Sequence, residues 1–517
     1  MRAIPPLLAA LLPLSLLGAS PAGSNQAAAL SARRPNILFI AVDDMNDWAV
    51  GGRPQVRTPN LDRLRARGIT FTNAHCASPS CHPSRVAVMT GVRPSTSGID
   101  HNVYGRTTPS WRAGPDSGTG ALENAVVLSQ HFRNHGYRAI GTGKIFHGLQ
   151  WVDGSENEPG DWDDYFPSAS DQIPFQPRPA DLVDDREAGI IGKRPIGGDT
   201  GRRGQVFGAH PLKVPDERMS DYQVVDWALK QLASPQDKPL FLAVGLFRPH
   251  IPWEVPQAYF DLYPLGDVQR PEVREDDLAD THGHNRVSWH QWVLANEEKF
   301  QMWERLIQGY QASITFADAQ IGRLLDGLST SPLADSTIIV LWGDHGMHLG
   351  EKQNWEKFTL WNRSTHVPLI IALPDGRNHG ASVPAPASLI DLYPTLCELA
   401  GLPIPDQCEG TSLDPQLMNP TQPRRTPAIT TQSMGLQSGH SVTNERWHYI
   451  RYFDGFEELY DLNADPGEFT NLAGEGALAS TKLELLEALK ESGAPLDGVY
   501  RRVDSGALVK PPRAPGN

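Results

Sequence analysis

Residues 81–91 carry the most specific chemical pattern in the chain, and they read CHPSRVAVMTG. Pro83 presets the first turn of a helix and Gly91 ends it, so Cys81 is predicted at the N-terminus of a short helix. Backbone N–H groups and the helix dipole favour an anion there. Arg85 lies one turn further along and projects toward the same end. The pattern therefore predicts nucleophilic chemistry at Cys81, in its simplest form a reactive thiol with a lowered pKa.

Two acidic pairs indicate a second chemical feature, a site for a divalent cation. Asp43 and Asp44 follow one apolar run, and Asp344 with His345 follows another. Three carboxylates, completed by His345 or a backbone group, suit Ca²⁺ or Mg²⁺. An Asp-Asp pair after a strand is, taken alone, more often a helix cap or a turn. The presence of both pairs at the ends of two strands of one sheet favours the metal site.

Apolar runs of strand length must position these residues. Continuous β-branched runs are typical of strands buried on both faces, and three of them are residues 37–42, 241–247 and 337–342. A helix is predicted from Pro59, with Thr58 as its N-cap and Gly68 as its stop, and a long one over about 303–328. Strands that alternate with helices imply an α/β fold with a large, mostly parallel sheet flanked by helices. Ligands of such sheets bind beyond the carboxyl ends of the strands, where the polar residues fall.

The composition changes along the chain and predicts its domain organisation. Residues 149–214 are dense in Asp, Pro and Gly and have no sustained period, which predicts irregular loops over the sheet edge. From about residue 426, short runs at 447–452 and 458–462 indicate antiparallel strands, and 482–492 an amphipathic helix. We therefore expect a catalytic domain at 34–425 and a smaller α+β C-terminal subdomain at 426–517.

Length and charge restrict the class of protein. The chain has 517 residues and a formal net charge of −14, which suits one large α/β enzyme domain with a smaller partner. An acidic balance argues against a nucleic-acid binder, whose electrostatic footprint is a basic face. An anionic substrate must be held by a local cluster of cations, because the field of the whole molecule would repel it.

The first 23 residues resemble a secretory signal peptide. Arg2 precedes an apolar run over 4–17, which small residues follow. The run is too short to span a bilayer, which needs about 20 apolar residues. The alternative is an apolar N-terminal helix. We expect an exported, soluble protein without a membrane span.

The four cysteines form two near pairs in the sequence. Cys397, on a helical stretch, and Cys408, in the Pro-rich loop after it, are placed for a local disulfide in an oxidising compartment. Cys76 and Cys81 could form a second one, which is the alternative to a reactive Cys81.

The motif at residue 81 resembles the signature of the sulfatase family, Cys (or Ser)-x-Pro-Ser-Arg followed by Thr-Gly, and departs from it only at Met89, where the family usually has Leu. The resemblance extends from Pro35 to about Leu472. Within the family it is greatest to the iduronate-2-sulfatases. Residues that carry this likeness are Lys144-Ile145-Phe146-His147, Arg248-Pro249-His250-Ile251-Pro252 and the His, rather than Asn, at position 345. The spacing of Cys397 and Cys408 is also similar to a disulfide of that group.

The resemblance implies an alkaline-phosphatase-like fold and a modified residue 81. A dedicated maturation enzyme that recognises Cys-x-Pro-x-Arg would convert Cys81 to Cα-formylglycine. A serine nucleophile would end as a stable sulfate ester, whereas a hydrated aldehyde carries a second hydroxyl. One hydroxyl attacks sulfur and releases the alcohol of the substrate. Loss of a proton from the other hydroxyl then expels sulfate by C–O cleavage and restores the aldehyde.

The resemblance also implies roles for the other candidate residues. One Ca²⁺ would be held by Asp43, Asp44, Asp344 and His345 together with the modified Cys81.

Five further side chains would act on the substrate or on residue 81. Arg85 and Lys144 would stabilise the formylglycine hydrate and the metal site. Lys357 and His250 would contact the sulfate, with His250 as general acid for the leaving oxygen. His147 would take the proton in the elimination step.

Together these features predict an exported, calcium-dependent sulfatase that acts on a sulfated sugar or polysaccharide. Its location would be secreted or periplasmic, or lysosomal in a eukaryote. The alternatives are a phosphatase or phosphonate hydrolase on the same scaffold, and an unmodified, inactive relative that binds sulfated glycans. Arg248 is a candidate for recognising a substrate carboxylate or for a structural salt bridge. Asp100, His101 and Asn102 are candidate substrate contacts.

Overall fold

The computed structural model describes residues 34–51, 55–102, 120–147, 160–167, 208–284, 287–433, 435–496, 501–502 and 508–509. Its centre is an eight-stranded sheet in the order β13-β2-β12-β9-β1-β7-β4-β5. In that order the strands are Ser382–Val383, Ile69–Phe71, Leu369–Ala372, Thr337–Gly343, Asn36–Val42, Leu240–Leu246, Arg138–Gly143 and Asp164–Phe166. The predicted signal peptide at 1–23 lies outside the described residues.

The middle of the sheet is parallel. Strand β1 pairs in parallel with β7 and with β9, and Val42 at its end is opposite Leu246 and Gly343. Strand β4 continues this arrangement beside β7. Strand β12 is antiparallel to both β9 and β2. The carboxyl ends of β4, β7, β1 and β9 therefore meet at one edge, and the predicted mostly parallel sheet is confirmed.

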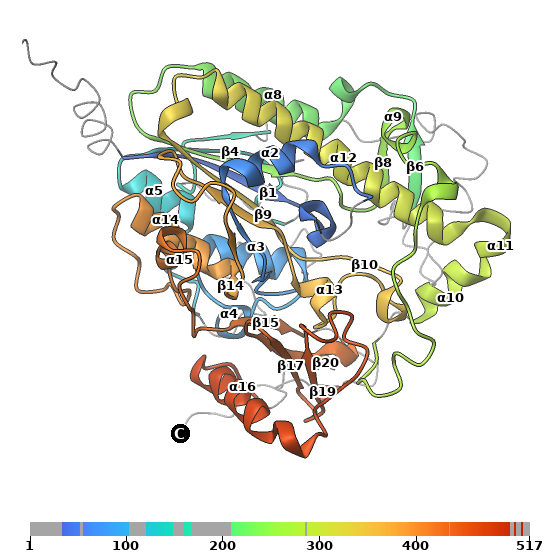
Figure 1. The fold of residues 1–517 in the computed structure, drawn as a ribbon. Coiled ribbons are helices and arrows are strands. Elements are labelled where there is room, and N and C mark those ends of the chain that lie inside the picture. The colour runs from blue at the N-terminus through green and yellow to red at the C-terminus, as the bar shows by residue number, and fades with distance from the viewer. Residues whose placement is uncertain are drawn as a thin grey trace, which may run out of the picture. The chain divides into compact units, whose positions relative to one another are not determined.

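Helices cover both faces of the sheet (Figure 1). Side chains alternate along β1, so Leu38, Ile40 and Val42 join one hydrophobic core and Ile37 and Phe39 the other. The first core is closed by helices α2 (Pro59–Arg67), α8 (Ser220–Ala233) and α12 (Met302–Ser329). The second is closed by α3 (Cys81–Thr90), α5 (Leu128–Asn134) and α14 (Leu392–Leu399).

Shorter elements connect these layers. The short strands are β3 (Ala74–His75), β6 (Ala209–Leu212), β8 (Trp253–Pro256), β10 (His348–Leu349), β11 (Trp355–Glu356) and β14 (Ala387–Ser388). The short helices are η1 (Asp47–Val50), α4 (Pro94–Ser97), α9 (Gln257–Phe260), α10 (Val287–Ala295), α11 (Glu297–Phe300), α13 (Asn362–Thr365) and α15 (Asp414–Met418). Residues 149–214 were expected to be irregular throughout, but their described parts contain β5 and β6, which pair with β4 and β8.

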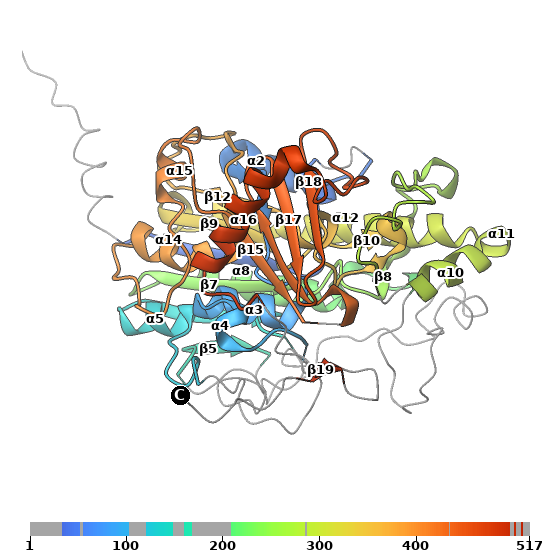
Figure 2. The same ribbon diagram turned by 90° about the horizontal axis from the view of Figure 1, so that it is seen from below.

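The C-terminal part forms a second, antiparallel sheet (Figure 2). Its strands are β15 (Ala428–Gln432), β16 (Gly439–Thr443), β17 (Trp447–Tyr452) and β18 (Glu457–Asp461). Helix α16 (Ala479–Glu491) packs on it through Leu485 and Leu489. Two more residue pairs, β19 (Arg501–Arg502) and β20 (Leu508–Val509), are antiparallel to each other. The predicted α+β composition of this part is confirmed, with four strands where the sequence indicated two.

Two further predictions concern membrane-spanning helices and disulfide bonds. Among the described residues, no helix is long and apolar enough to cross a membrane. The predicted Cys397–Cys408 disulfide and the alternative Cys76–Cys81 disulfide are both absent from the structure, in which all four cysteines are free. Cys397 and Cys408 nevertheless belong to the same core, in which Cys397 is buried and against which Cys408 packs.

Candidate active site

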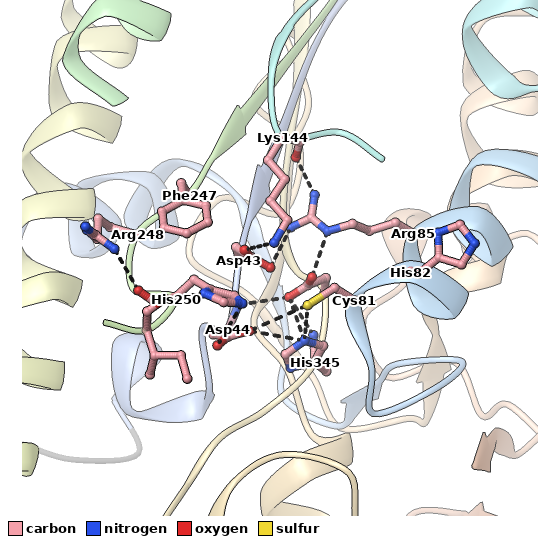
Figure 3. A network of polar contacts seen from close by, with 12 residues as sticks. Asp43, Asp44, Cys81, His82, Arg85, Lys144, Phe247, Arg248, His250 and His345 are labelled. Carbon is pink, nitrogen blue, oxygen red and sulfur yellow. Dashed lines mark hydrogen bonds and ion pairs between the residues drawn. The ribbon is translucent and has the colours of Figure 1, made fainter. Parts of the chain in front are cut away.

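The candidate site lies at the sheet edge where four parallel strands end. Strands β1, β9, β4 and β7 are each followed within four residues by polar side chains that point toward one another (Figure 3). These side chains are Asp43 and Asp44, Asp344 and His345, Lys144, and His250. All six are buried. The parallel register brings them together, as the positions of the polar residues predicted.

The backbone of Asp44 explains how two consecutive carboxylates reach one place. Neighbouring residues of an extended strand point to opposite faces. Asp44 has φ of 60°, in the left-handed region, so the chain turns just after β1. Oxygen atoms of both Asp43 and Asp44 consequently lie within 4.8 Å of Cys81 Sγ and of a His250 ring nitrogen.

Helix α3 presents Cys81 to this cluster from the other side. The helix begins at Cys81 and ends before Gly91, which has φ of 72°, and all ten of its residues are buried. Cys81 Sγ lies 3.2 Å from His345 Nε2, 3.0 Å from Lys357 Nζ and 3.9 Å from Asp44 Oδ1. The predicted placement of Cys81 at the N-terminus of a short helix is confirmed, and the structure places its sulfur next to the acidic pairs.

Asn102 fixes the start of α3 and was missed in this role. Its Oδ1 accepts hydrogen bonds from Ser80 Oγ at 2.8 Å and from the backbone N–H of His82 at 2.9 Å. Ser80, the N-cap residue, makes no side-chain cap bond of its own. Asn102 therefore satisfies a helix-terminal donor on the residue next to Cys81. Of the other two suggested substrate contacts, Asp100 and His101 pair with each other at 2.8 Å.

Each carboxylate of the cluster has a cationic partner. Arg85 contacts Asp344 Oδ2 at 2.7 Å and Asp43 Oδ1 at 3.2 Å. Lys144 forms an ion pair with Asp43. Lys357 Nζ lies 2.5 Å from Asp44 Oδ1. Because all these side chains are buried, the pairs are shielded from water and salt.

The cations act on the ionisation of Cys81. Burial alone would raise the pKa of its thiol, but Lys144, Lys357 and His345 together hold that pKa well below its usual range. The carboxylates act in the opposite sense on His345. Burial disfavours its charge, yet the neighbouring Asp344 raises the pKa of His345 to about 9. The site therefore favours a negative charge at residue 81 and positive charge around it.

Two further histidines face the same point. Burial lowers the pKa of His147, and the neighbouring Cys81 side chain opposes this shift. His250 donates from Nδ1 to the carbonyl of Ile251 at 2.6 Å, which leaves Nε2 toward Asp44 Oδ2 at 3.9 Å. All ten candidate residues from the sequence are thus in one cluster, and their individual roles stay predictions.

Arg248 has a different role from either of those considered. Its guanidinium donates to the backbone carbonyls of Glu254, His250 and Pro252 at 3.0, 2.9 and 2.8 Å. These bonds hold the loop that carries His250. Arg248 is therefore a structural residue of this loop that binds carbonyl oxygens.

The donor atoms fit a hard divalent cation. Ligand atoms of Asp43, Cys81, Asp344 and His345 lie within 4.8 Å of one another. Asp44 Oδ2 is buried and accepts no hydrogen bond within the described residues, as expected of an oxygen that a cation would bind. Carboxylate oxygens suit Ca²⁺ or Mg²⁺, whereas a thiolate suits softer metals. Replacement of the Cys81 sulfur by oxygen would make the set more consistent with Ca²⁺.

Comparison with protein families identifies related chains. Residues 35–402 match the family model described as Sulfatase. Residues 350–494 match the model of the C-terminal part of N-sulphoglucosamine sulphohydrolase.

Curated relatives agree with these matches. The chain is 39% identical over 465 residues to a sulfatase of Formosa agariphila, which covers 88% of this chain and 86% of that protein. It is 30% identical over 436 residues to iduronate 2-sulfatase of Homo sapiens, with coverages of 74% and 72%.

Solved structures share the fold. The phosphonate monoester hydrolase SpPMH from Silicibacter pomeroyi superposes with a TM-score of 0.69 at 20% identity, covering 92% of this chain and 99% of that one. The protein BT4656, solved with its substrate D-glucosamine-2-N,6-O-disulfate, superposes with a TM-score of 0.63 at 20% identity, with coverages of 89% and 97%. The fold is the alkaline-phosphatase-like one that was predicted.

Proposed function

The chain belongs to the sulfatase family and is a sulfuric ester hydrolase, and from this premise we propose that it removes sulfate from a sulfated sugar or polysaccharide by means of a formylglycine at residue 81 and a bound Ca²⁺. One observation carries the proposal. Cys81, at the start of the buried helix α3, contacts Lys357 and His345 at a cluster of three paired carboxylates.

Conversion of Cys81 by a formylglycine-generating maturation enzyme is the first part of the proposal. The intact Cys81-His82-Pro83-Ser84-Arg85 sequence supplies the recognition motif. A hydrated aldehyde at residue 81 would supply one hydroxyl that attacks sulfur and releases the substrate alcohol, and a second whose deprotonation expels sulfate by C–O cleavage and restores the aldehyde. Cys81 is fully buried in the folded protein, so we expect conversion to precede folding.

The metal is the second part. The residues that would hold Ca²⁺ are Asp43, Asp44, Asp344, His345 and the modified Cys81. When bound, the ion would supply Lewis-acid chemistry, stabilising negative charge on the sulfate group and lowering the pKa of the attacking hydroxyl. Arg85 pairs with Asp43 and Asp344, and Lys144 pairs with Asp43. These ion pairs neutralise the two carboxylates and fix their positions.

Three further side chains have proposed roles in proton transfer and charge stabilisation. Lys357, 3.0 Å from Cys81 Sγ, would neutralise charge that develops on the sulfate group. His250 would protonate the leaving oxygen from Nε2, the nitrogen that faces the cluster. His147, whose pKa responds to the side chain of residue 81, would accept the proton whose removal expels sulfate.

Substrate and location follow from relatives and sequence. The human relative acts, by its name, on iduronate 2-sulfate, and another relative from Formosa agariphila is described as an ulvan-active sulfatase. A sulfated carbohydrate is therefore the proposed substrate class, and specificity like that of iduronate 2-sulfatase is a finer proposal. The apolar N-terminal segment supports export to the periplasm or exterior, or to the lysosome in a eukaryote.

Mass spectrometry of residue 81 tests the proposal. Trypsin should release residues 68–85, which contain both Cys76 and Cys81. In protein from its native host, residue 81 should be lighter than cysteine by the conversion to an aldehyde, while Cys76 should take up an alkylating reagent and serves as the internal control. Sulfatase activity should be lost in Cys81→Ala and retained in Cys76→Ala. Cysteine alone at position 81 would contradict the catalytic proposal and would favour an inactive glycan-binding relative.

A phosphatase or phosphonate hydrolase is the second candidate, because phosphonate monoester hydrolases share the fold. Comparing kcat/KM on an aryl sulfate, an aryl phosphate and an aryl phosphonate distinguishes the two. The sulfate ester should be the preferred substrate.

A further inference from the structure

The backbone conformation of Asp44 needs support from outside its own turn. A left-handed φ is uncommon for a residue other than glycine, and it persists only where surrounding contacts impose it. On one side, the Asp44 N–H donates to Asp344 Oδ1 at 2.9 Å. On the other side, the Asp44 carbonyl accepts a hydrogen bond from the hydroxyl of Tyr310 at 2.8 Å. Tyr310 lies on α12, which is remote from Asp44 in the sequence.

The Tyr310 hydroxyl is fully engaged by this turn. Besides donating to Asp44, it accepts the backbone N–H of Asn46 at 3.0 Å. Its ring packs edge-on against Trp48 and Trp253, with centroids 5.8 and 5.6 Å away. Tyr310 has no exposed surface. The ring is therefore held by packing, and the hydroxyl has one position, in which it holds the turn on both sides of Met45.

Asn46 connects this turn to the loop after β9, which carries Asp344. Its Nδ2 donates to the carbonyl of Met347 at 3.0 Å, three residues beyond Asp344. Its Oδ1 accepts the N–H of Trp48 at 3.1 Å and caps η1. Tyr310 and Asn46 thus join the loop after β1 to the loop after β9, the two loops that carry the three carboxylates.

We propose that Tyr310 is a positioning residue for the divalent cation: its hydroxyl, together with Asn46, holds Asp44 in the conformation that brings its carboxylate to the ion. The inference rests on the proposed metal-dependent function. Tyr310 does not itself reach the cluster through its side-chain oxygen, which is occupied by the backbone of the turn. Its effect should therefore appear in metal affinity.

The test is Tyr310→Phe, which keeps the ring and removes one oxygen. Calcium affinity of the metal-free protein is measured by titration calorimetry with Ca²⁺ alone, and the melting temperature is recorded in chelator and in Ca²⁺. Loss of a buried hydrogen bond to the ligand turn should weaken Ca²⁺ binding by about five- to tenfold. The rise in melting temperature that Ca²⁺ produces should shrink accordingly.

Tyr263→Phe is the matched control. The Tyr263 hydroxyl is also buried, and it accepts the backbone N–H of Arg57 at 2.8 Å and contacts Thr315 Oγ1 of α12 at 2.5 Å. Neither contact involves the loop after β1 or the loop after β9, which carry the three carboxylates. Both variants should lose some stability in chelator, but only Tyr310→Phe should lose calcium affinity.

A second variant distinguishes a specific effect on Ca²⁺ binding from a general folding defect. Asn46→Ala leaves the Tyr310 hydroxyl in place and removes the link to Met347, and it should also weaken Ca²⁺ binding. Unchanged affinity in a folded Tyr310→Phe protein would overturn the inference and leave the proposed function intact. A wild-type protein that binds no Ca²⁺ would overturn both, so the two failures are distinguishable.

Discussion

Three buried carboxylates at the site are each paired with an arginine or lysine side chain. The pairs are formed by Asp43, Asp44 and Asp344 with Arg85, Lys144 and Lys357. Without a metal these charges cancel, and removal of one partner would leave a buried charge uncompensated. A divalent cation would add two positive charges to this balanced set. The local field would then attract a sulfate ester, although the whole chain carries −14.

Lys357 is the cation for which this balance makes the clearest prediction. It contacts both Asp44 Oδ1 and Cys81 Sγ, so it should act on bound sulfate as well as on the carboxylate. Lys357→Gln should lower kcat/KM on an aryl sulfate by about 10²- to 10³-fold, the usual loss for a charge-stabilising donor. Lys230→Gln, on the exposed surface of α8, is the control and should be near wild type. A Lys357→Gln enzyme with more than about a tenth of wild-type kcat/KM would contradict this role.

Sequence patterns predict residues of a site well only where neighbours in sequence carry the chemistry. Asp43 with Asp44, and Asp344 with His345, are adjacent pairs at strand ends, and they were found. Asn102 acts on an N–H 20 residues away and Tyr310 on a carbonyl 266 residues away. Neither has a local pattern that would indicate its partner.

At the scale of elements, the boundaries of helices and strands could be predicted more closely than their interactions. Helix α2 begins at Pro59 and ends before Gly68, as expected, with Thr58 as its N-cap. The Thr58 side chain makes no cap bond, however. Asp318 of α12 accepts the N–H groups of Asn60 at 3.1 Å and Leu61 at 2.7 Å instead. A cap supplied by another helix depends on tertiary packing, which periodicity and propensity do not describe.

Strand β16 contains a buried histidine that should make stability depend on pH. His440 Nε2 donates to the carbonyl of Pro495 at 2.9 Å, and His440 Nδ1 lies 3.0 Å from Thr431 Oγ1, which donates to it when the ring is neutral. Burial lowers the pKa of His440 from 6.5 to about 4, although the Pro495 bond and Asp100 oppose the shift. The unfolded chain therefore binds the proton first as the pH falls from 6.5 to 4.

His440→Gln tests this dependence. The contribution of His440 to stability is present above pH 6.5 and is lost as the pH falls through 4, by about 3 kcal/mol in all. Other groups titrate alike in both proteins, so the difference in melting temperature isolates His440. Between pH 6.5 and 4 the wild type should lose more stability than His440→Gln. Parallel declines in the two melting temperatures would contradict the assignment.

On the scale of the whole molecule, a buried lysine joins distant parts of the chain. Lys352 Nζ lies 2.6 Å from Asp277 Oδ1 and also donates to the carbonyl of Glu468. Its ammonium lies 5.6 and 5.3 Å from the ring centroids of Trp361 and Tyr460. The ammonium of Lys352 thus connects Asp277 and Trp361 with Tyr460 of the C-terminal sheet and with Glu468 beyond that sheet. The predicted boundary between residues 425 and 426 separates Lys352 from two of these partners.

A double-mutant cycle measures this connection. Lys352→Met should destabilise the protein by about 3–5 kcal/mol, because Asp277, which is 3% exposed, would keep a buried charge without its partner. Asp277→Asn removes that charge, so Lys352→Met combined with Asp277→Asn should be more stable than Lys352→Met alone. The melting temperatures of the four proteins give the coupling. Additive effects would mean that Asp277 is solvated after the lysine is lost. The Lys352–Asp277 ion pair would then be accessible to water. In that case the C-terminal sheet would be held mainly by its apolar contacts and neutral hydrogen bonds.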